Sequence, residues 1–236
     1  MTDVAKEFLK THPHKIELHC HTAKVSPCSD IGVNDMARIY ASEGYSGLVL
    51  TNHFYPWHPK NKKAYDKYVE EYIEEYKRFC EIGEDVGLKV YLGMEIRFPE
   101  NANDYLVYGI DPDFVRNKIS PDMKTLEDFV KVAKSDDNLI IQAHPFRNGM
   151  VLANESLIDG IEVYNVHPNH NSRVGFAAKY AEELNFVCTC GSDTHHYGQG
   201  ALSALITREL PKDSKDLVKY LVNEPIYKIG NSIITF

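Results

Sequence analysis

The sequence predicts an α/β protein in which short strands alternate with helices. Apolar runs of strand length are separated by segments with helical periodicity, a pattern typical of parallel α/β architectures. Side chains that bind metals follow most of these runs, and parallel strands often end at an active site in this way. No Pro/Gly/Ser-rich linker and no low-complexity tract interrupts the 236 residues, so we treat 1–236 as a single domain.

Seven apolar runs are predicted as strands. They are short and are bounded by polar residues or by segments of helical periodicity, as expected for strands of an α/β sheet. They lie at residues 16–20, 47–51, 89–93, 105–109, 139–142, 160–164 and 186–189.

Five segments between or after these strands are predicted as helices. They lie at residues 34–43, 62–85, 125–134, 172–183 and 212–223. The second is the most regular, because aromatic side chains such as Tyr65, Tyr72 and Phe79 share one face while Lys and Glu occupy the other. We expect this aromatic stripe to be part of the core rather than a binding surface.

Charge and hydropathy exclude several classes of function. Lys and Arg number 26 against 34 Asp and Glu, which gives a formal charge of −8 and argues against a nucleic-acid polymer as partner. A small phosphorylated molecule in a local pocket stays compatible with this charge. The sequence has no apolar run of membrane-spanning length and starts without the apolar segment of a signal peptide, so we expect a cytoplasmic protein.

The five cysteines do not form a disulfide framework. Their number is odd and their spacing irregular, as expected in a reducing compartment. Cys188 and Cys190 lie two residues apart on a predicted strand, where they can be a metal-binding pair or small buried side chains. The second interpretation is favoured, because free cysteine is among the most buried residue types.

Two paired motifs near opposite ends of the chain predict a metal centre. His19 and His21 close the first strand, and Asp193 and His195 follow the last. Residues i and i+2 of a strand point to the same face, so each pair presents two ligands in one direction. Imidazole together with carboxylate suits Zn, Mn or Fe, and a site this rich in ligands usually holds more than one ion.

Other ligand-type side chains follow intervening strands. His53 comes after the second strand, Glu95 after the third and His144 after the fifth, while Glu162 lies within the sixth. Glu162 is either a ligand or a buried carboxylate that hydrogen-bonds to one. The predicted metal ligands are therefore His19, His21, His53, Glu95, His144, Asp193 and His195.

Binding a phosphorylated substrate requires cations beside the metals. Arg147 follows the His144 segment closely and is the best candidate, since Arg binds phosphate oxygens in a bidentate manner. Lys24 and Arg97 are further candidates, and Asn165 and His167, just past the sixth strand, are expected to shape the pocket. Proton transfer to a leaving group is assigned to Asp193, His195 or a metal-bound water, among which the sequence does not choose.

Six short segments together resemble the PHP (polymerase and histidinol phosphatase) superfamily. In chain order they read ELHCHT, LTNH, GMEIRF, QAHPF, IEVYN and CGSDTHH, and they extend from about Lys15 to about Gly200. The resemblance implies an irregular seven-stranded (β/α) barrel of TIM-like type. It also implies a metal-dependent phosphoesterase, in which two or three divalent ions and a metal-bound hydroxide hydrolyse a small phosphomonoester or a nucleotide-like substrate.

The resemblance also implies how the ligands are grouped. It places His19, His21, Glu95 and Asp193 at one ion, His53 and His195 at a second, and Glu95 with His144 at a third. The chain departs from the family pattern in three places. The Asp or His expected about six residues after the first pair is missing, and the nearest carboxylate is Asp30. Asn52 replaces the usual Asp, and Asp104 stands where many members have His.

Two alternatives remain open. Amidohydrolase-like metal hydrolases also begin with His-x-His and end with a carboxylate, but they normally have eight strands and often a carboxylated Lys, and no Lys stands at a central strand end here. A non-catalytic metal-binding module is the other alternative, because one expected ligand near Ser26 is absent. A polymerase-associated nuclease fits least, since neither a polymerase portion nor a basic track is present.

Overall fold

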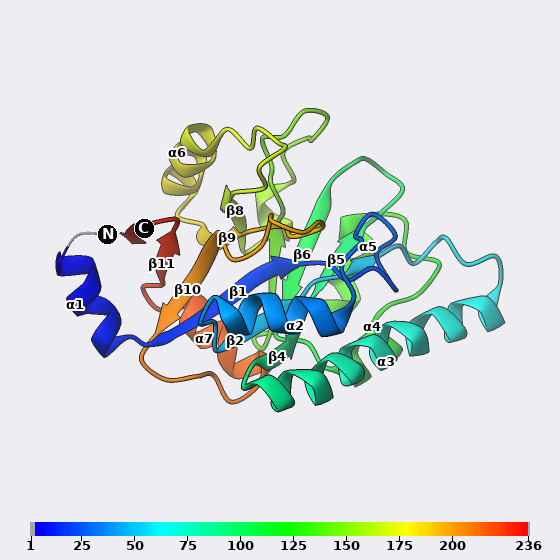
Figure 1. Ribbon diagram of the computed structural model, residues 1–236. Coiled ribbons are helices and arrows are strands. Elements are labelled where there is room, and N and C mark those ends of the chain that lie inside the picture. The colour runs from blue at the N-terminus through cyan, green and yellow to red at the C-terminus, as the bar shows by residue number, and fades with distance from the viewer. Residues whose placement is uncertain (1–2, 236) are drawn as a thin grey trace.

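A computed structural model describes residues 3–235 and contains two mixed β-sheets with helices around them (Figure 1). The strands of the first sheet, in spatial order, are β12 (Ser232–Thr235), β11 (Ile226–Ile229), β10 (Ser203–Thr207), β1 (His14–Cys20), β2 (Gly47–Leu50) and β4 (Lys89–Leu92). Those of the second are β3 (His53–Phe54), β5 (Met94–Arg97), β6 (Asp104–Tyr108), β7 (Leu139–Gln142), β8 (Gly160–Asn165) and β9 (Val187–Gly191).

The seven predicted strands are all present, but the closed seven-stranded barrel is not. Over residues 3–235 the hydrogen-bonded ladder is divided into two sheets, and β1/β10, β5/β6 and β6/β7 pair antiparallel. The division falls where β2 and β4 stop and β3 and β5 begin. Gly93 fills the narrow gap between β4 and β5, since a Cβ there would lie 2.6 Å from a methyl group of Val49. A single parallel bridge from Cys20 to Thr194 joins β1 to the segment after β9.

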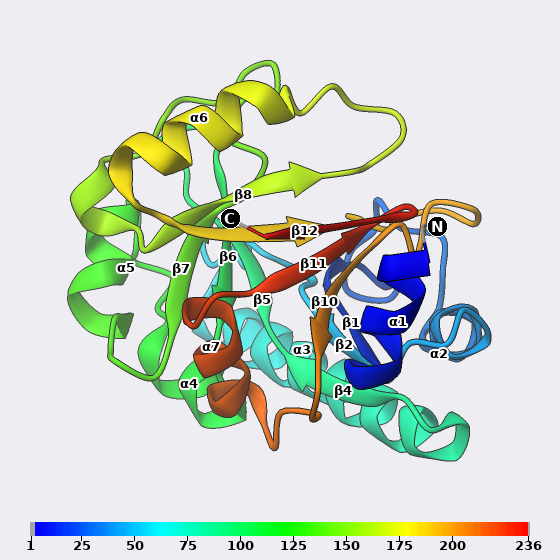
Figure 2. The ribbon, with the colours of Figure 1, turned by 90° about the vertical axis from the view of Figure 1, so that its left-hand side faces the viewer.

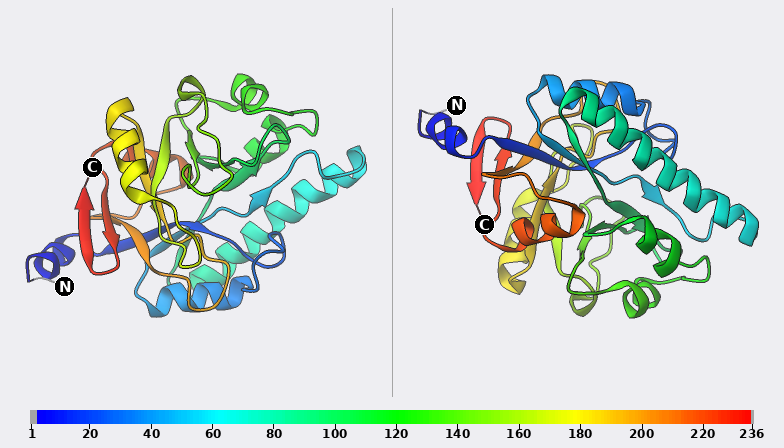
Figure 3. Two further views of the ribbon diagram at one scale, coloured as in Figure 1. Left: turned by 90° about the horizontal axis from the view of Figure 1, so that it is seen from above. Right: turned by 90° about the horizontal axis from the view of Figure 1, so that it is seen from below.

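The helices are α1 (Asp3–Thr11), α2 (Val33–Ser42), α3 (Lys62–Val86), α4 (Pro112–Lys118), α5 (Leu126–Ala133), α6 (Val174–Leu184) and α7 (Ser214–Val222), with a short 3-10 turn at Glu155–Leu157. Five of them match the predicted segments. Within the first sheet β11 and β12 form a terminal hairpin, and α6 packs over β8 of the second (Figure 2). Helices α2 and α3 lie side by side along one face (Figure 3).

Helix α3 confirms the aromatic stripe as core. The Asn61 side chain caps its start by accepting a hydrogen bond from the Ala64 amide, and Gly87 ends it in the left-handed conformation with φ 74°. Tyr65, Tyr72 and Phe79 are buried as predicted.

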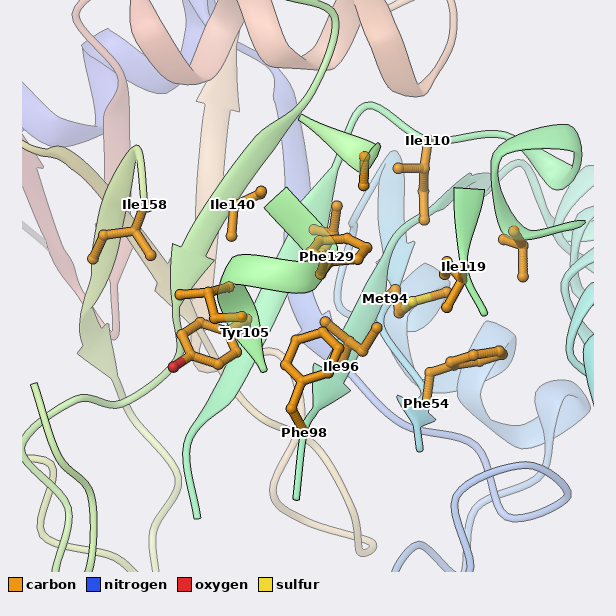
Figure 4. Packing of buried hydrophobic residues seen from close by; sticks show 14 of the residues in the cluster. Phe54, Met94, Ile96, Phe98, Tyr105, Ile110, Ile119, Phe129, Ile140 and Ile158 are labelled. Atoms are coloured by element: carbon orange, nitrogen blue, oxygen red, sulfur yellow. The ribbon is translucent and has the colours of Figure 1, made fainter. Parts of the chain in front are cut away.

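The second sheet packs against its helices through a large apolar cluster (Figure 4). Side chains from β3, β5 and β6, such as Phe54, Ile96 and Tyr105, meet Phe129 of α5 in this cluster. The cluster packs the paired strands β3 and β5 against the same helices. Both strands carry predicted metal ligands, so the packing also fixes where those ligands lie.

Two further expectations about the chain can be compared with the structure. Cys188 and Cys190 are buried on β9 and make no disulfide, which favours the interpretation as small core residues. Among residues 3–235 no helix combines the length and apolarity needed to cross a membrane.

Candidate metal centre

The two paired motifs lie side by side. Backbone hydrogen bonds join them, with the His21 amide donating to Thr194 O at 3.0 Å and the Asp193 amide donating to His19 O at 2.8 Å. The end of β1 and the segment after β9 are therefore fixed relative to each other by main-chain contacts (Figure 1). This pairing brings residues 174 positions apart in the sequence, His19 and Asp193, into one site.

Four buried side chains converge with the separations expected around one ion. Nε2 of His19 lies 3.4 Å from both Glu95 Oε1 and Asp193 Oδ1. Nε2 of His21 lies 3.4 Å from Glu95 Oε2 and 3.3 Å from Asp193 Oδ1. Ligands bonded at 2.0–2.1 Å to one ion are about 3.4 Å apart, so each histidine is spaced from the two carboxylates as ligands of a common ion would be, and the ligand atoms of His19, His21 and Glu95 all lie within 4.8 Å of one another.

The two histidines also have the unpaired atoms that a metal requires. Nε2 of His19 and Nε2 of His21 are buried, and neither makes a hydrogen bond of acceptable geometry within residues 3–235. A buried polar atom without a partner is costly, and a bound cation removes that cost. Nδ1 of His19 donates to Glu162 Oε1 at 2.8 Å, which leaves the Nε2 lone pair directed at Glu95 and Asp193.

A second group of ligand atoms comes from His21, His53 and His195, which lie within 4.8 Å of one another. Nδ1 of His195 donates to the Asp193 carbonyl at 2.9 Å, so Nε2 is the nitrogen available to a metal. The thiol of Cys28 contacts the rings of both His53 and His195. Burial opposes its ionisation, but these two contacts outweigh burial and lower the pKa of Cys28 to about 6.

A third group consists of His53, Glu95 and Asp104, with His144 beside it. Glu95 is central, because its oxygens lie 2.9 Å from His53 Nδ1 and 3.2 Å from His144 Nε2. Asp104 accepts two hydrogen bonds from Arg97, at 2.7 and 2.5 Å. Asp104 is thus shared between this third group and an arginine at the wall of the site.

Two residues behind the ligands hold them in place. Glu162 is buried and accepts hydrogen bonds from His19 Nδ1, the His144 amide and Asn165 Nδ2. The structure thus identifies Glu162 as the buried carboxylate that orients a ligand. Arg147 donates from Nη2 to Asp193 Oδ2 and to Asn165 Oδ1, both at 2.5 Å. Asp193 therefore turns one oxygen toward the histidine pair and the other toward Arg147.

The backbone is strained at two of these side chains. His144 has φ 33° and Asp193 has φ 54°, in the left-handed region that side chains with a Cβ rarely adopt. Such a conformation costs of order 1–3 kcal/mol and persists where the surroundings enforce it. The hydrogen bonds from the two amides, to Glu162 and to His19 O, provide that enforcement.

The charges of the site are strongly coupled. Burial alone would raise the pKa of Glu95 and Asp193, but neighbouring histidines hold the pKa of both carboxyls well below its usual range. Burial would likewise lower the pKa of His19 and His53. The adjacent carboxylates outweigh it, raising the pKa of His19 well above 6.5 and that of His53 to about 10. His21 is the exception, because burial and its histidine neighbours lower its pKa.

Metal binding to the metal-free protein is expected to release protons. His19 and His53 have raised pKa values, so both are protonated at neutral pH and must each lose a proton to bind a cation. Affinity is therefore expected to rise with pH throughout the range below about 10, the pKa of His53. Calorimetric titration with Mn or Zn in buffers of different ionisation enthalpy measures the protons released. A binding heat that is independent of the buffer would contradict these protonation states.

A cavity of about 690 Å³ opens above the cluster. Its wall includes most of the predicted site residues, namely His53, Glu95, Arg97, His144, Arg147, His167, Asp193 and His195. His19 and His21 lie fully buried beneath it, and Asn165 is a buried partner of Arg147 rather than part of the wall.

Lys24 and Asp30 do not line this cavity. Nζ of Lys24 lies 3.8 Å from Glu75 Oε2, and the Lys24 side chain is 48% exposed. Asp30 is exposed and lies 3.2 Å from Nδ1 of His196. The side chain of neither residue therefore reaches the predicted ligand atoms.

Asn52, which replaces the usual Asp of the family pattern, hydrogen-bonds to the loop that follows β1. Its Oδ1 accepts hydrogen bonds from the Thr22 amide at 2.7 Å and from Ser26 Oγ at 2.9 Å, and its Nδ2 donates to Thr22 Oγ1. These contacts fix the loop that follows β1, and Asn52 reaches a histidine ring only through Ser26, whose Oγ lies 3.4 Å from Nδ1 of His21. An amide, which both donates and accepts, suits this position better than a carboxylate.

Sequence reasoning missed Cys28 and Glu17. Cys28 follows His21 by seven residues, close to the place where the resemblance implies a ligand, and this spacing was the available signal. Glu17 is buried on β1, and its Oε1 accepts from the amides of His19 and Ser192. Because it alternates with apolar residues on a strand, the sequence offered no sign that it joins the two paired motifs.

The structure of this chain is similar to those of several solved proteins. No protein-family model and no curated protein matches the sequence. A two-domain protein of Bacteroides vulgatus, described as containing a predicted PHP-like metal-dependent phosphoesterase, superposes with a TM-score of 0.65 at 14% identity. The match covers 93% of this chain but 66% of that protein, so the chain spans somewhat less than two thirds of its length.

Two other solved structures are also similar. PsfC of Pseudomonas syringae matches with a TM-score of 0.61 at 17% identity, over 87% of each chain. A protein of Bifidobacterium adolescentis described as a candidate metal-dependent phosphoesterase matches with a TM-score of 0.55 at 15% identity, over 87% of this chain and 95% of that one. The fold of the chain is therefore similar to that of proteins described as PHP-like metal-dependent phosphoesterases, the fold that its motifs predict.

Proposed function

We propose that this protein hydrolyses phosphate esters of small molecules with two or three divalent metal ions (Mn, Zn or Fe) held in the buried cluster. The observation that carries the proposal is the convergence of the unpaired Nε2 atoms of His19 and His21 on two carboxylates at ligand-to-ligand distances. Bound divalent ions would supply an activated water and positive charge for the phosphoryl oxygens. The similar fold of proteins described as phosphoesterases supports the same reaction.

The chain's own residues provide the rest of the site. Arg147 and Arg97 lie on the cavity wall, where their guanidinium groups can bind the oxygens of a phosphate group. His195 is on the same wall, and its contacts with Cys28 and Asp193 outweigh burial and raise its pKa. Once Nε2 holds a metal this imidazole has no proton to give there, so the leaving oxygen would take its proton from a water held by the ions, while Asp193, 3.4 Å away, would help to hold the His195 ring in place.

The size and lining of the cavity favour a small substrate. Its volume of about 690 Å³ is within the range of small-molecule sites. The wall is rich in histidine, asparagine and arginine, which suits a polar phosphorylated molecule. His167 is part of the wall, and Asn165 is held beneath the wall by Arg147.

Hydrolysis of phosphate esters by metal-loaded protein tests the proposal. We expect release of phosphate from p-nitrophenyl phosphate and from a panel of sugar and nucleoside phosphates. The activity should disappear after chelation and return on addition of Mn, Zn or Fe. Hydrolysis that survives complete removal of metal, or metal-loaded protein that hydrolyses none of the panel, would refute the proposed reaction.

Replacing Arg147 by alanine is expected mainly to raise KM for phosphorylated substrates, by about 10-fold or more, since a charge-assisted hydrogen bond contributes about 1.5–3 kcal/mol. Steady-state kinetics on the best substrate of the panel measures the change. Arg116→Ala is the matched control, because Arg116 pairs with Glu70 on the surface. Metal content is measured in parallel, since Arg147 also contacts Asp193. An unchanged KM would remove Arg147 from the phosphate site.

A further inference from the structure

The loop between β1 and α2 brings a cysteine to the place where a ligand is missing from the sequence pattern. Two side chains tie this loop to the site. Ser26 Oγ accepts a hydrogen bond from the His53 amide at 2.9 Å, and Ser29 Oγ donates to the carbonyls of His21 and His195 at 3.0 and 2.9 Å. Cys28 lies between these two serines in the chain. The loop is therefore anchored on one side to His53 and on the other to His195.

This anchoring directs the Cys28 side chain toward the metal centre and keeps the Asp30 side chain outside it. The Cys28 thiol contacts the rings of His53 and His195 and lines the cavity with them. Asp30, the carboxylate of the same loop, is 57% exposed and pairs with His196. Its amide donates to the His195 carbonyl at 3.0 Å, which fixes the backbone with the carboxylate outside the cavity.

The neighbouring imidazoles point independently to a cation at this place. Ligand atoms of His21, His53 and His195 lie within 4.8 Å of one another. Nδ1 of His53 is a buried atom that has no hydrogen bond of acceptable geometry within the described residues. Nδ1 of His195 is occupied by the Asp193 carbonyl, so its Nε2 is left for a metal. Imidazole and thiolate are both typical ligands of Zn, and the Cys28 thiol lies on the same cavity wall as His53 and His195.

We infer that the Cys28 thiolate is a protein ligand of the metal ion held by His53 and His195, in place of the missing Asp or His. On binding, the thiol proton leaves to solvent and the sulfur coordinates the ion. A thiolate is a soft ligand, so this ion is Zn or Fe(II) rather than Mn or Mg. The inference rests on the metal centre of the proposed function and not on the reaction.

Cobalt substitution tests the inference through a signal independent of activity. Co(II) coordinated by a thiolate gives a near-ultraviolet charge-transfer band, whereas imidazole and carboxylate ligands do not. The metal-free full-length protein is loaded with Co(II) and compared with Cys28→Ser, Cys28→Asp and the control Cys80→Ala. Cys80 is half-buried in another cluster and lies outside the cavity. Co(II) bound per chain is measured by elemental analysis on the same samples.

We expect the band in the wild type and in Cys80→Ala, and its loss in Cys28→Ser together with weaker binding of one ion by about 10- to 100-fold. Cys28→Asp should recover that binding without the band. Bound metal should also slow the reaction of the Cys28 thiol with a thiol-modifying reagent. All five cysteines lie in the described chain, and Cys28 is the exposed one.

Three results would overturn the inference. In the first, Co(II) binds the wild type without the charge-transfer band. In the second, the band persists in Cys28→Ser. In the third, the Cys28 thiol reacts equally fast with and without metal. A band in a protein that hydrolyses no phosphate ester would support Cys28 as a ligand while refuting the proposed reaction. The two proposals can therefore fail separately.

Discussion

Replacing Asp193 by asparagine is expected to lower phosphate-ester hydrolysis by more than about 100-fold and to reduce the metal content, since even residues behind the ligands contribute 10- to 100-fold. Oδ1 of Asp193 faces the Nε2 atoms of His19 and His21, and Oδ2 binds Arg147. The neutral amide of asparagine removes the negative charge that both a metal held by the histidine pair and the Arg147 guanidinium require. Asparagine is chosen because position 193 has φ 54°, which Asn tolerates better than most residues.

Turnover, metal content and far-ultraviolet circular dichroism are measured on the same preparation. Asp30→Asn is the matched control, because that carboxylate is exposed and outside the cavity. The control should keep wild-type activity and metal. If Asp193→Asn keeps wild-type turnover with a full complement of metal, Asp193 is not a ligand and the first ion site is misassigned.

Replacing Glu162 by glutamine is expected to weaken metal binding by about 10- to 100-fold, although Glu162 is not proposed as a ligand. Its carboxylate accepts from three donors, on His19, His144 and Asn165. A carboxamide has one acceptor and one donor atom, so at least one of these donors then faces another donor. If that donor is His19 Nδ1, the ring is free to turn or to change tautomer, and Nε2 no longer offers its lone pair to the metal.

Competition with a metal indicator measures this affinity in the wild type, in Glu162→Gln and in Glu75→Gln. Glu75 is the matched control, since it is a buried carboxylate with the same 1% exposure that accepts from Thr22 and contacts no predicted ligand. We expect the control to bind metal as the wild type does. Equal affinity in all three proteins would show that the hydrogen bond to His19 does not orient the ligand.

The positions of seven of the twelve described strands were predictable because the signal for each is local, whereas β3, β5, β10, β11 and β12 were not predicted. The seven apolar runs all became strands, and the regular helix appears as α3 with the bounds Lys62–Val86. The pairing of the strands was not predictable, because it depends on contacts between distant segments. Nothing in residues 139–142 indicates that β7 runs antiparallel to β6 and parallel to β8. The terminal hairpin of β11 and β12 was missed, since its strands are short and partly exposed.

The metal ligands were predictable where a short motif fixes their direction. His19 with His21, and Asp193 with His195, share a face because residues two apart on a strand do so. Arg147 was expected to bind phosphate, but the sequence could not show its contact with Asp193, which depends on two separate segments. Cys28 was missed for the same reason, because only the folded loop decides whether residue 28 or residue 30 faces the site.

A crystal structure of the Mn- or Zn-loaded protein, with anomalous scattering recorded at the absorption edge of the metal, tests the central claim most directly. We expect an anomalous peak within bonding distance of Nε2 of His19, Nε2 of His21 and Oδ1 of Asp193, and at least one further peak beside His53 and Glu95. The contradicting result is an electron density map, recorded at saturating metal concentration, in which water lies between these atoms or the atoms face one another without a metal. This cluster would then not be a metal centre.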